Sequence, residues 1–180
     1  MHYEHLFTLS LMERIETTIL RNLIFNDEYS KKVLPFLHSE YFENVHEKII
    51  FEEATKFIVK YNNLPTREAI SIEAEKRTDI TDEIFKQVEE QIGVLEDYPA
   101  DNQWLLDTTE KWCRDRAIYL ALVESISIAD GNTEKKTPDA IPSILSDALA
   151  VSFDKHVGHD YLEDYEERYE SYHKKEDLIP

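Results

Sequence analysis

Residues 101–129 of the chain read DNQWLLDTTEKWCRDRAIYLALVESISIA, and this stretch decides the fold. Asp101 follows a break at Pro99 and is a residue type that caps helix N-termini. Gly131 stands where a glycine is expected just after a helix C-terminus. At 1.5 Å rise per residue, the helix between them would be about 40 Å long. Such a helix extends beyond a small bundle and needs cover elsewhere.

The apolar side chains of this long helix fall on one stripe, which indicates what kind of cover is needed. A stripe that is apolar throughout favours an antiparallel partner helix or a neighbouring subunit. We therefore predict a long protruding helix within residues 99–131. Its candidate packing residues are Trp112, Tyr119, Leu122 and Ile126.

Residues 1–98 predict a bundle of shorter helices. Apolar residues recur there at three- and four-residue steps from about residue 8 to 25, 44 to 61 and 85 to 95, and a short helix after Thr66 carries Ala69, Ile70 and Ile72. Asn26 and Thr66 are suited to cap helices, whereas Pro35 must break or kink the second one. Only three glycines and six prolines occur in the chain, which favours an all-α fold. The side chains expected to point inward include Val45 and Tyr61.

Two amphipathic helices are predicted at the end of the chain, after a flexible loop at residues 132–138. They either fold back onto their own bundle or dock on another protein or subunit. The apolar face of the first comprises Ile141, Ile144, Leu145, Ala148, Leu149 and Phe153. The candidate docking face of the second comprises Tyr161, Leu162, Tyr165, Tyr169 and Tyr172.

The net charge of −18 limits the binding partners of this chain. Binding to a phosphate backbone requires local positive charge, so we do not expect the chain alone to bind DNA. An acidic surface suits solubility and basic protein partners, or is simply well solvated. The single cysteine, Cys113, fits a reducing compartment. There is no signal peptide or membrane-length apolar run, so we expect a cytoplasmic protein without membrane contact.

Motifs for catalysis are absent from the sequence. The glycines are too few and scattered for a phosphate-binding loop, so we expect no nucleotide hydrolysis, catalytic residue or cofactor in this chain itself. His156 and His159 could meet one metal ion, as in a metal hydrolase. Gly158 interrupts helical geometry between them, which favours a polar hinge over a metal site.

Several stretches of the sequence resemble the N-terminal part of the DnaB-like hexameric replicative DNA helicases of T-even-type bacteriophages. The most specific block begins with Ala140-Ile-Pro142 and continues through Ser152-Phe-Asp154. The resembling residues are 19–25, 32–42, 104–112, 116–117, 140–142, 152–154, 157–160 and 164–166. The resemblance implies a helical collar with a protruding hairpin, then a linker, then a RecA-like ATPase domain.

The resemblance also implies roles for the segments of this chain. Residues 139–153 would be a linker helix that packs on the neighbouring subunit, and the long helix would be one arm of the hairpin. An ATPase domain that binds ATP and Mg²⁺ is expected beyond residue 180, within a ring that moves single-stranded DNA and unwinds duplex DNA 5′-to-3′. Expected partners are other copies of the chain, primase and a helicase loader. The alternative is a free-standing acidic adaptor or DNA mimic that binds a basic protein.

Overall fold

The computed structural model describes residues 14–132 and 136–153, and every regular element within these ranges is a helix. The predicted all-α class is therefore confirmed. The α-helices are α1 (Ile15–Phe25), α2 (Asp27–Val33), α3 (Val45–Tyr61), α4 (Arg67–Glu75), α5 (Asp82–Val94), α6 (Asn102–Ala129) and α7 (Ile141–Leu149). Three short 3-10 helices, η1 (Leu34–Phe36), η2 (Ser39–Tyr41) and η3 (Pro138–Ala140), complete the described elements.

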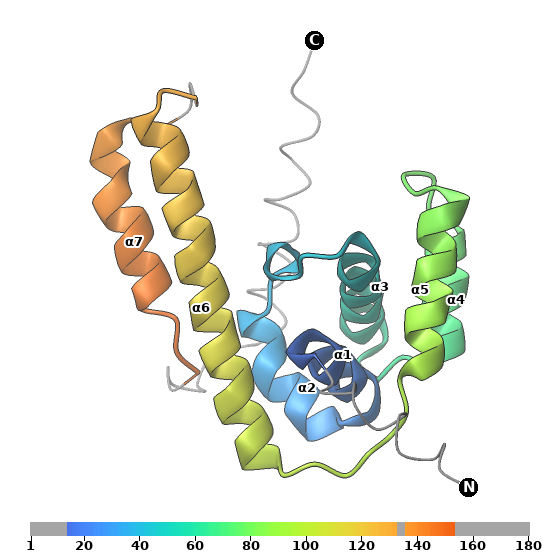
Figure 1. Cartoon of the computed structure of the whole chain (residues 1–180). Coiled ribbons are helices and arrows are strands. Elements are labelled where there is room, and N and C mark those ends of the chain that lie inside the picture. Colours follow the sequence, from blue (N-terminus) through green and yellow to red (C-terminus); the bar gives the residue numbers. More distant parts are fainter. Residues whose placement is uncertain (1–13, 133–135, 154–180) are drawn as a thin grey trace, which may run out of the picture.

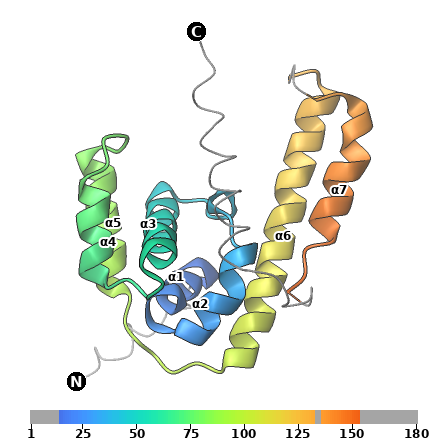
Figure 2. The ribbon, with the colours of Figure 1, turned by 180° about the vertical axis from the view of Figure 1, so that it is seen from behind.

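Helices α1 to α5 form a bundle, and α6 runs along one side of it (Figure 1). Helices α4 and α5 lie at the opposite side of the bundle from α6, beyond α3. The second half of α6 extends past the bundle, where α7 runs antiparallel beside it (Figures 1 and 2). Helices α6 and α7 thus form a hairpin that protrudes from the bundle.

The helix boundaries follow the local signals in the sequence. The side-chain oxygens of Asn26, Thr66 and Asp101 each accept a hydrogen bond from the backbone N–H three residues on, at 3.0, 3.1 and 2.8 Å. These bonds satisfy N–H groups that a helix cannot pair internally, and they confirm the three predicted caps. Gly131 follows α6 with a positive φ of 72°, a conformation that favours glycine. Pro35 lies in a 3-10 turn that ends α2, as its missing N–H requires.

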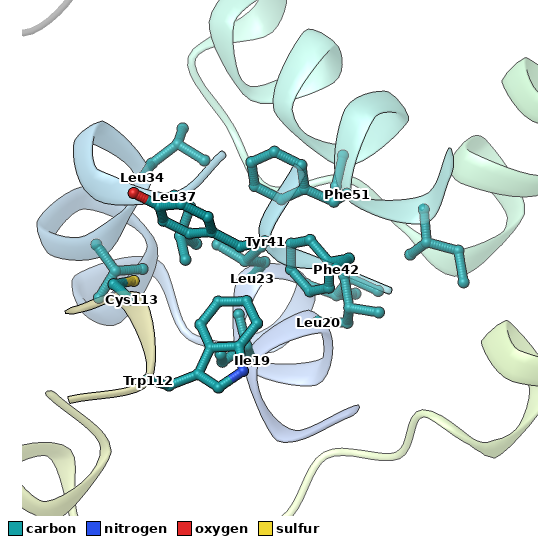
Figure 3. Packing of buried hydrophobic residues seen from close by; sticks show 14 of the residues in the cluster. Ile19, Leu20, Leu23, Leu34, Leu37, Tyr41, Phe42, Phe51, Trp112 and Cys113 are labelled. Carbon is teal, nitrogen blue, oxygen red and sulfur yellow. The ribbon is translucent and has the colours of Figure 1, made fainter. Parts of the chain in front are cut away.

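An aromatic cluster joins the first half of α6 to the bundle (Figure 3). The ring of Trp112 lies 5.9 Å from that of Tyr41 and 5.2 Å from that of Phe42, measured between ring centroids. Deeper in the same interface, the hydroxyls of Tyr29 and Thr109 are hydrogen-bonded at 2.7 Å. Burial raises the pKa of Tyr29 above its ordinary value, so this hydroxyl stays protonated. The position of α6 is therefore fixed by aromatic packing and by a buried hydrogen bond.

Two residues that were expected to point inward, Val45 and Tyr61, are exposed, and so is Ile72. Val45 and Tyr61 are 50% and 55% exposed because they are the first and last residues of α3, at its ends. Ile72 is 53% exposed, since α4 buries Ile70 and Ala74 on its other side. Two residues correspond to a turn of about 200°, so Ile72 cannot share the face of either neighbour.

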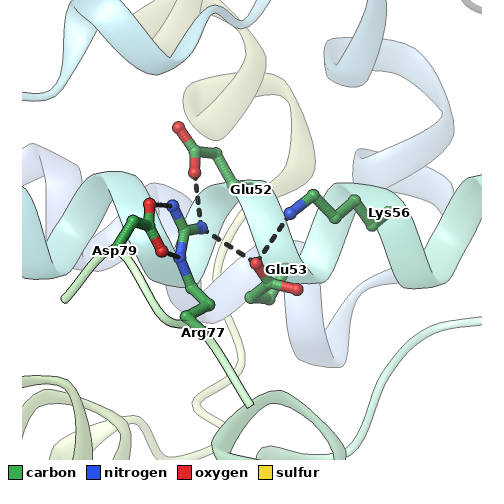
Figure 4. Close-up of polar contacts among 5 residues, drawn as sticks. All are labelled: Glu52, Glu53, Lys56, Arg77 and Asp79. Atoms are coloured by element: carbon green, nitrogen blue, oxygen red, sulfur yellow. Dashed lines mark hydrogen bonds and ion pairs between the residues drawn. The ribbon is translucent and has the colours of Figure 1, made fainter. Parts of the chain in front are cut away.

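An ion-pair network centred on Arg77 holds the turn between α4 and α5 against α3 (Figure 4). One terminal nitrogen of Arg77 donates to Glu52 at 2.7 Å and to Glu53 at 2.9 Å, and the other lies 2.6 Å from Asp79. Lys56 adds a further ion pair to Glu53 at 2.9 Å. The hydrogen bonds from Arg77 hold the pKa of Asp79 below its usual value. This network therefore anchors α4 and α5 through charge as well as through apolar packing.

Glu47 is a buried carboxylate that is only partly satisfied. It is 1% exposed, and its Oε1 accepts a hydrogen bond from Arg14 at 3.0 Å. Its Oε2 is also buried and has no hydrogen-bond partner within the described part of the chain. Burial therefore raises the pKa of Glu47, and the attraction of Arg14 offsets this only in part.

Replacing Glu47 by Gln is expected to stabilise the fold at neutral pH. Because the folded state raises the pKa of Glu47, ionising this carboxyl destabilises the fold as pH rises above about 4.3, the pKa of an unfolded Glu. Gln keeps the shape and an acceptor oxygen for Arg14 without the buried charge, and the Arg14 side chain, which is 48% exposed, stays hydrated. Urea unfolding measures the free energy of unfolding of both proteins. The difference between Glu47→Gln and the unmodified chain should grow from about pH 4 to about pH 7, because the carboxyl ionises above its unfolded-state pKa. A gap that is constant over this range would contradict the expected charge state.

Candidate interaction surface on the α6–α7 hairpin

Most of the side chains that are buried in the second half of α6, where α7 runs beside it, are small. The buried residues of the second half of α6 recur every three or four positions and are Ala117, Ala121, Ser125 and Ile128. Ala148 is the buried residue of α7. Small side chains at a helix contact allow the two axes to approach closely. One face of the second half of α6 is therefore covered within the chain.

The end of α7 is tied back to the bundle. The Nε of Arg114 in α6 donates a hydrogen bond to the carbonyl oxygen of Val151 at 3.0 Å. Two residues later, the ring of Phe153 stacks on Phe36 of η1, with the ring centroids 4.6 Å apart. These contacts close the hairpin at its base and bring residue 153 to the side of the bundle.

The structure places the candidate residues of the first predicted tail helix within the same chain. Ala148 is buried, and Leu149 is exposed at 65%. The half-buried members of the set are Ile141, Ile144, Leu145 and Phe153. Helix α7 therefore folds back within its own chain, but onto α6 rather than onto the bundle, and forms the second arm of the hairpin. Packing of these residues on a neighbouring subunit as a linker helix stays a prediction, and Leu149 is the member left most accessible for it.

A second apolar face of α6 is uncovered in the structure. We define the exposed stripe as Tyr119, Leu122, Val123 and Ile126, which are 55%, 47%, 49% and 61% exposed. Steps of three and four residues place these side chains on one side of the helix. At 3.6 residues per turn, that side lies about 150° round the helix from the face that α7 covers.

The exposed stripe continues the side of α6 that carries Trp112. Tyr119 lies seven residues after Trp112, so the two side chains point nearly the same way. The bundle covers Trp112, which is 8% exposed, but α6 extends past the bundle. The stripe predicted from the sequence is therefore divided by the structure: Trp112 lies in the bundle core, and Tyr119, Leu122 and Ile126 lie on the exposed side of α6. Their role in packing between copies of the chain stays a prediction.

Cys113 lies beside Trp112 in this interface and is fully buried. Burial raises the pKa of the Cys113 thiol to about 12. The thiolate is the reactive form of cysteine, so this side chain acts as a small apolar residue of the core.

The remaining candidates lie outside the described residues. They are the second predicted tail helix, with Tyr161, Leu162, Tyr165, Tyr169 and Tyr172, and the histidines His156 and His159. Within residues 14–132 and 136–153, no group of His, Cys, Asp or Glu side chains could hold a metal ion. No helix in the part that the structure describes is long and apolar enough to cross a membrane.

One contact near the stripe could not be found from sequence spacing. Arg116 of α6 pairs with Glu43, which lies just before α3, at 2.7 Å. The two residues are 73 positions apart, so neither helical periodicity nor a motif relates them. Val123 is different, because its place on the stripe follows directly from its spacing.

The fold and the uncovered stripe define a class of protein: a helical bundle with a protruding hairpin that presents an apolar face. No protein-family model matches the chain. It is 36% identical over 170 residues to a DnaB-like replicative helicase of Enterobacteria phage T4. The alignment covers 90% of this chain but only 36% of that relative, so the chain spans about a third of the relative's length. The chain is thus related to the DnaB-like replicative helicases, which confirms the resemblance found in the sequence.

Proposed function

We propose that this chain is the N-terminal assembly module of a phage replicative helicase and acts in DNA replication by holding copies of the protein together. The observation that carries the proposal is the exposed stripe on the second half of α6. The similarity to a phage replicative helicase supports the biological setting. In the intact protein, the module would help to maintain a hexameric ring.

A second copy of the same helix is the occupant that best fits the exposed stripe. Tyr119, Leu122 and Ile126 follow the three- and four-residue steps with which helices pack on one another. The exposed stripe continues the side of α6 that packs on the bundle at Trp112. Because α6 extends past the bundle, this side is uncovered from Tyr119 onward. In a two-fold symmetric pair, identical helices present the same apolar face to one another, which favours self-association.

The strength of this contact can be placed within limits. Burying four such side chains contributes about 1.5 kcal/mol or more each, and association costs a comparable total in lost freedom. We therefore expect weak self-association of the isolated chain. A ring in which other segments already hold the subunits together would strengthen it through effective concentration.

The other activities belong to the longer protein in this proposal. ATP hydrolysis with Mg²⁺, movement of single-stranded DNA and 5′-to-3′ unwinding are assigned to a RecA-like domain that this chain does not include. Primase and a helicase loader are the proposed partners of the assembled ring. The high negative charge of this chain supports the assignment of DNA binding to other parts of the intact protein.

Molar mass as a function of concentration tests the proposal directly. The 180-residue chain should be mostly monomeric near about 10 µM and should form larger species towards about 1 mM, the range expected of a weak interface. Sedimentation equilibrium measures this without immobilising the protein. A chain that remains monomeric over the whole range contradicts self-association through the hairpin.

A further inference from the structure

Tyr119, the first residue of the exposed stripe along α6, is contacted by the charged side chain of Arg116 from the preceding turn. The guanidinium carbon of Arg116 lies 5.0 Å from the centre of the Tyr119 ring. A terminal nitrogen of the same guanidinium donates to Oε1 of Glu43 at 2.7 Å. The side chain of Arg116 is only 15% exposed, whereas that of Glu43 is 63% exposed. A continuous contact therefore runs from the bundle at Glu43, through Arg116, to the exposed stripe.

This arrangement restricts the Tyr119 side chain before any partner binds. A planar guanidinium stacks on the face of an aromatic ring and is attracted by it. Glu43 accepts a hydrogen bond from the same guanidinium, so the ring lies against a group that is also paired with a residue of the bundle. Side chains that are already ordered lose less freedom on association.

Glu43 also makes the position of Arg116 compatible with an apolar interface. A guanidinium beside an apolar contact would lose hydration when a partner binds, and an opposite charge compensates for that loss. The Nε of Arg116 is buried and has no hydrogen-bond acceptor among the residues that the structure describes. The guanidinium of Arg116 is therefore oriented by its contacts with Glu43 and with the Tyr119 ring.

We propose that Arg116 is a positioning residue of the self-association surface: held by Glu43, it fixes the Tyr119 ring in the orientation that binds a second copy of the chain. Tyr119 is the aromatic member of the stripe, and tyrosine is enriched among the side chains that dominate binding at interfaces. The inference rests on the proposed function, because it assigns a role within the same surface. It links the bundle to the hairpin contact, so the surface depends on a residue outside α6.

Three variants of the full 180-residue chain test this role by sedimentation equilibrium. Arg116→Met and Glu43→Gln should each weaken self-association by about three- to tenfold, the range expected from loss of a cation–π contact. Arg116→Lys should fall between Arg116→Met and the unmodified chain, because it keeps the charge but not the planar group. Lys111→Met is the matched control: it removes one positive charge from an exposed position of the same helix, where Lys111 pairs with Asp115. It should change the association constant by less than about twofold.

A double-mutant cycle with Tyr119→Leu shows whether Arg116 acts through the ring. In the Tyr119→Leu background, Arg116→Met should have less than about a twofold effect, since the two residues share one interaction. An undiminished effect in that background overturns the inference, as does normal association of Arg116→Met. Circular dichroism and the urea midpoint check that each variant is folded, and Arg116→Lys carries the test if Arg116→Met is not.

The outcome also separates this inference from the proposed function. If Leu122→Asp abolishes association while Arg116→Met leaves it intact, the stripe is the interface and only the role of Arg116 fails. If the unmodified chain does not associate at any concentration, the proposed function fails and the inference is overturned with it.

Discussion

A chain that carries both Leu122→Asp and Ile126→Asp is expected to remain helical and to lose self-association by at least about a hundredfold. Both positions lie on the exposed stripe, at 47% and 61% exposure, so the carboxylates stay hydrated in the monomer. In the associated state the same carboxylates would be buried against apolar side chains without a counter-charge. That cost is several kcal/mol and exceeds what a weak interface can offset.

The matched control places the same charge elsewhere on α6. Gln103→Asp together with Lys111→Gln also lowers the net charge by two, at exposed positions away from the stripe. This control should associate like the unmodified chain, apart from a small general repulsion that added salt removes. Molar mass across concentration and the helical circular dichroism signal are measured for both. Equal loss in the two variants would point to net charge, and no loss in either would exclude the stripe as the interface.

The structure changes which substitutions can test docking by the hairpin. Leu145 lies on an apolar face predicted from the sequence, but it is half-buried and packs within its own chain. A charge at Leu145 would disturb the fold of the hairpin, and a loss of assembly would then have two explanations. Leu149 is 65% exposed and avoids that ambiguity, as do Leu122 and Ile126 on the stripe.

Local features of this fold could be predicted because their physical causes are local. The caps at Asn26, Thr66 and Asp101 depend on one side chain and one N–H three residues away. The choice of partner for an amphipathic face is not local. The spacing of residues 141–149 indicates that they need cover, but not that α6 of the same chain provides it.

Within α6 too, sequence spacing does not show which part of an apolar face is covered. Heptad spacing relates Trp112 to Tyr119 and gives no sign that one is covered and the other exposed. That difference arises because α6 extends past the bundle, which depends on how far helices from residues 14–95 reach. The pair formed by Arg116 and Glu43 depends in turn on the position of α6 against the segment between η2 and α3. Both features require the assembled fold.

Replacing Trp112 by Ala is expected to lower the free energy of unfolding by about 3–5 kcal/mol, a large fraction of the stability of a typical domain. The indole is 8% exposed and lies against Tyr41 and Phe42, so its removal leaves a cavity between α6 and the bundle. Lost contacts between aromatic rings add to the lost burial. Urea unfolding followed by circular dichroism measures the change.

The same helix supplies a control of the same residue type. Trp104 is 54% exposed in the first turn of α6, so Trp104→Ala should cost less than about 1 kcal/mol. Comparable losses for the two tryptophans would contradict the assigned core. If Trp112 holds α6 on the bundle, Trp112→Ala reduces stability, whereas aspartates at Leu122 and Ile126 reduce association and leave stability nearly unchanged. One side of one helix would then serve folding where the bundle covers it and assembly where the bundle ends.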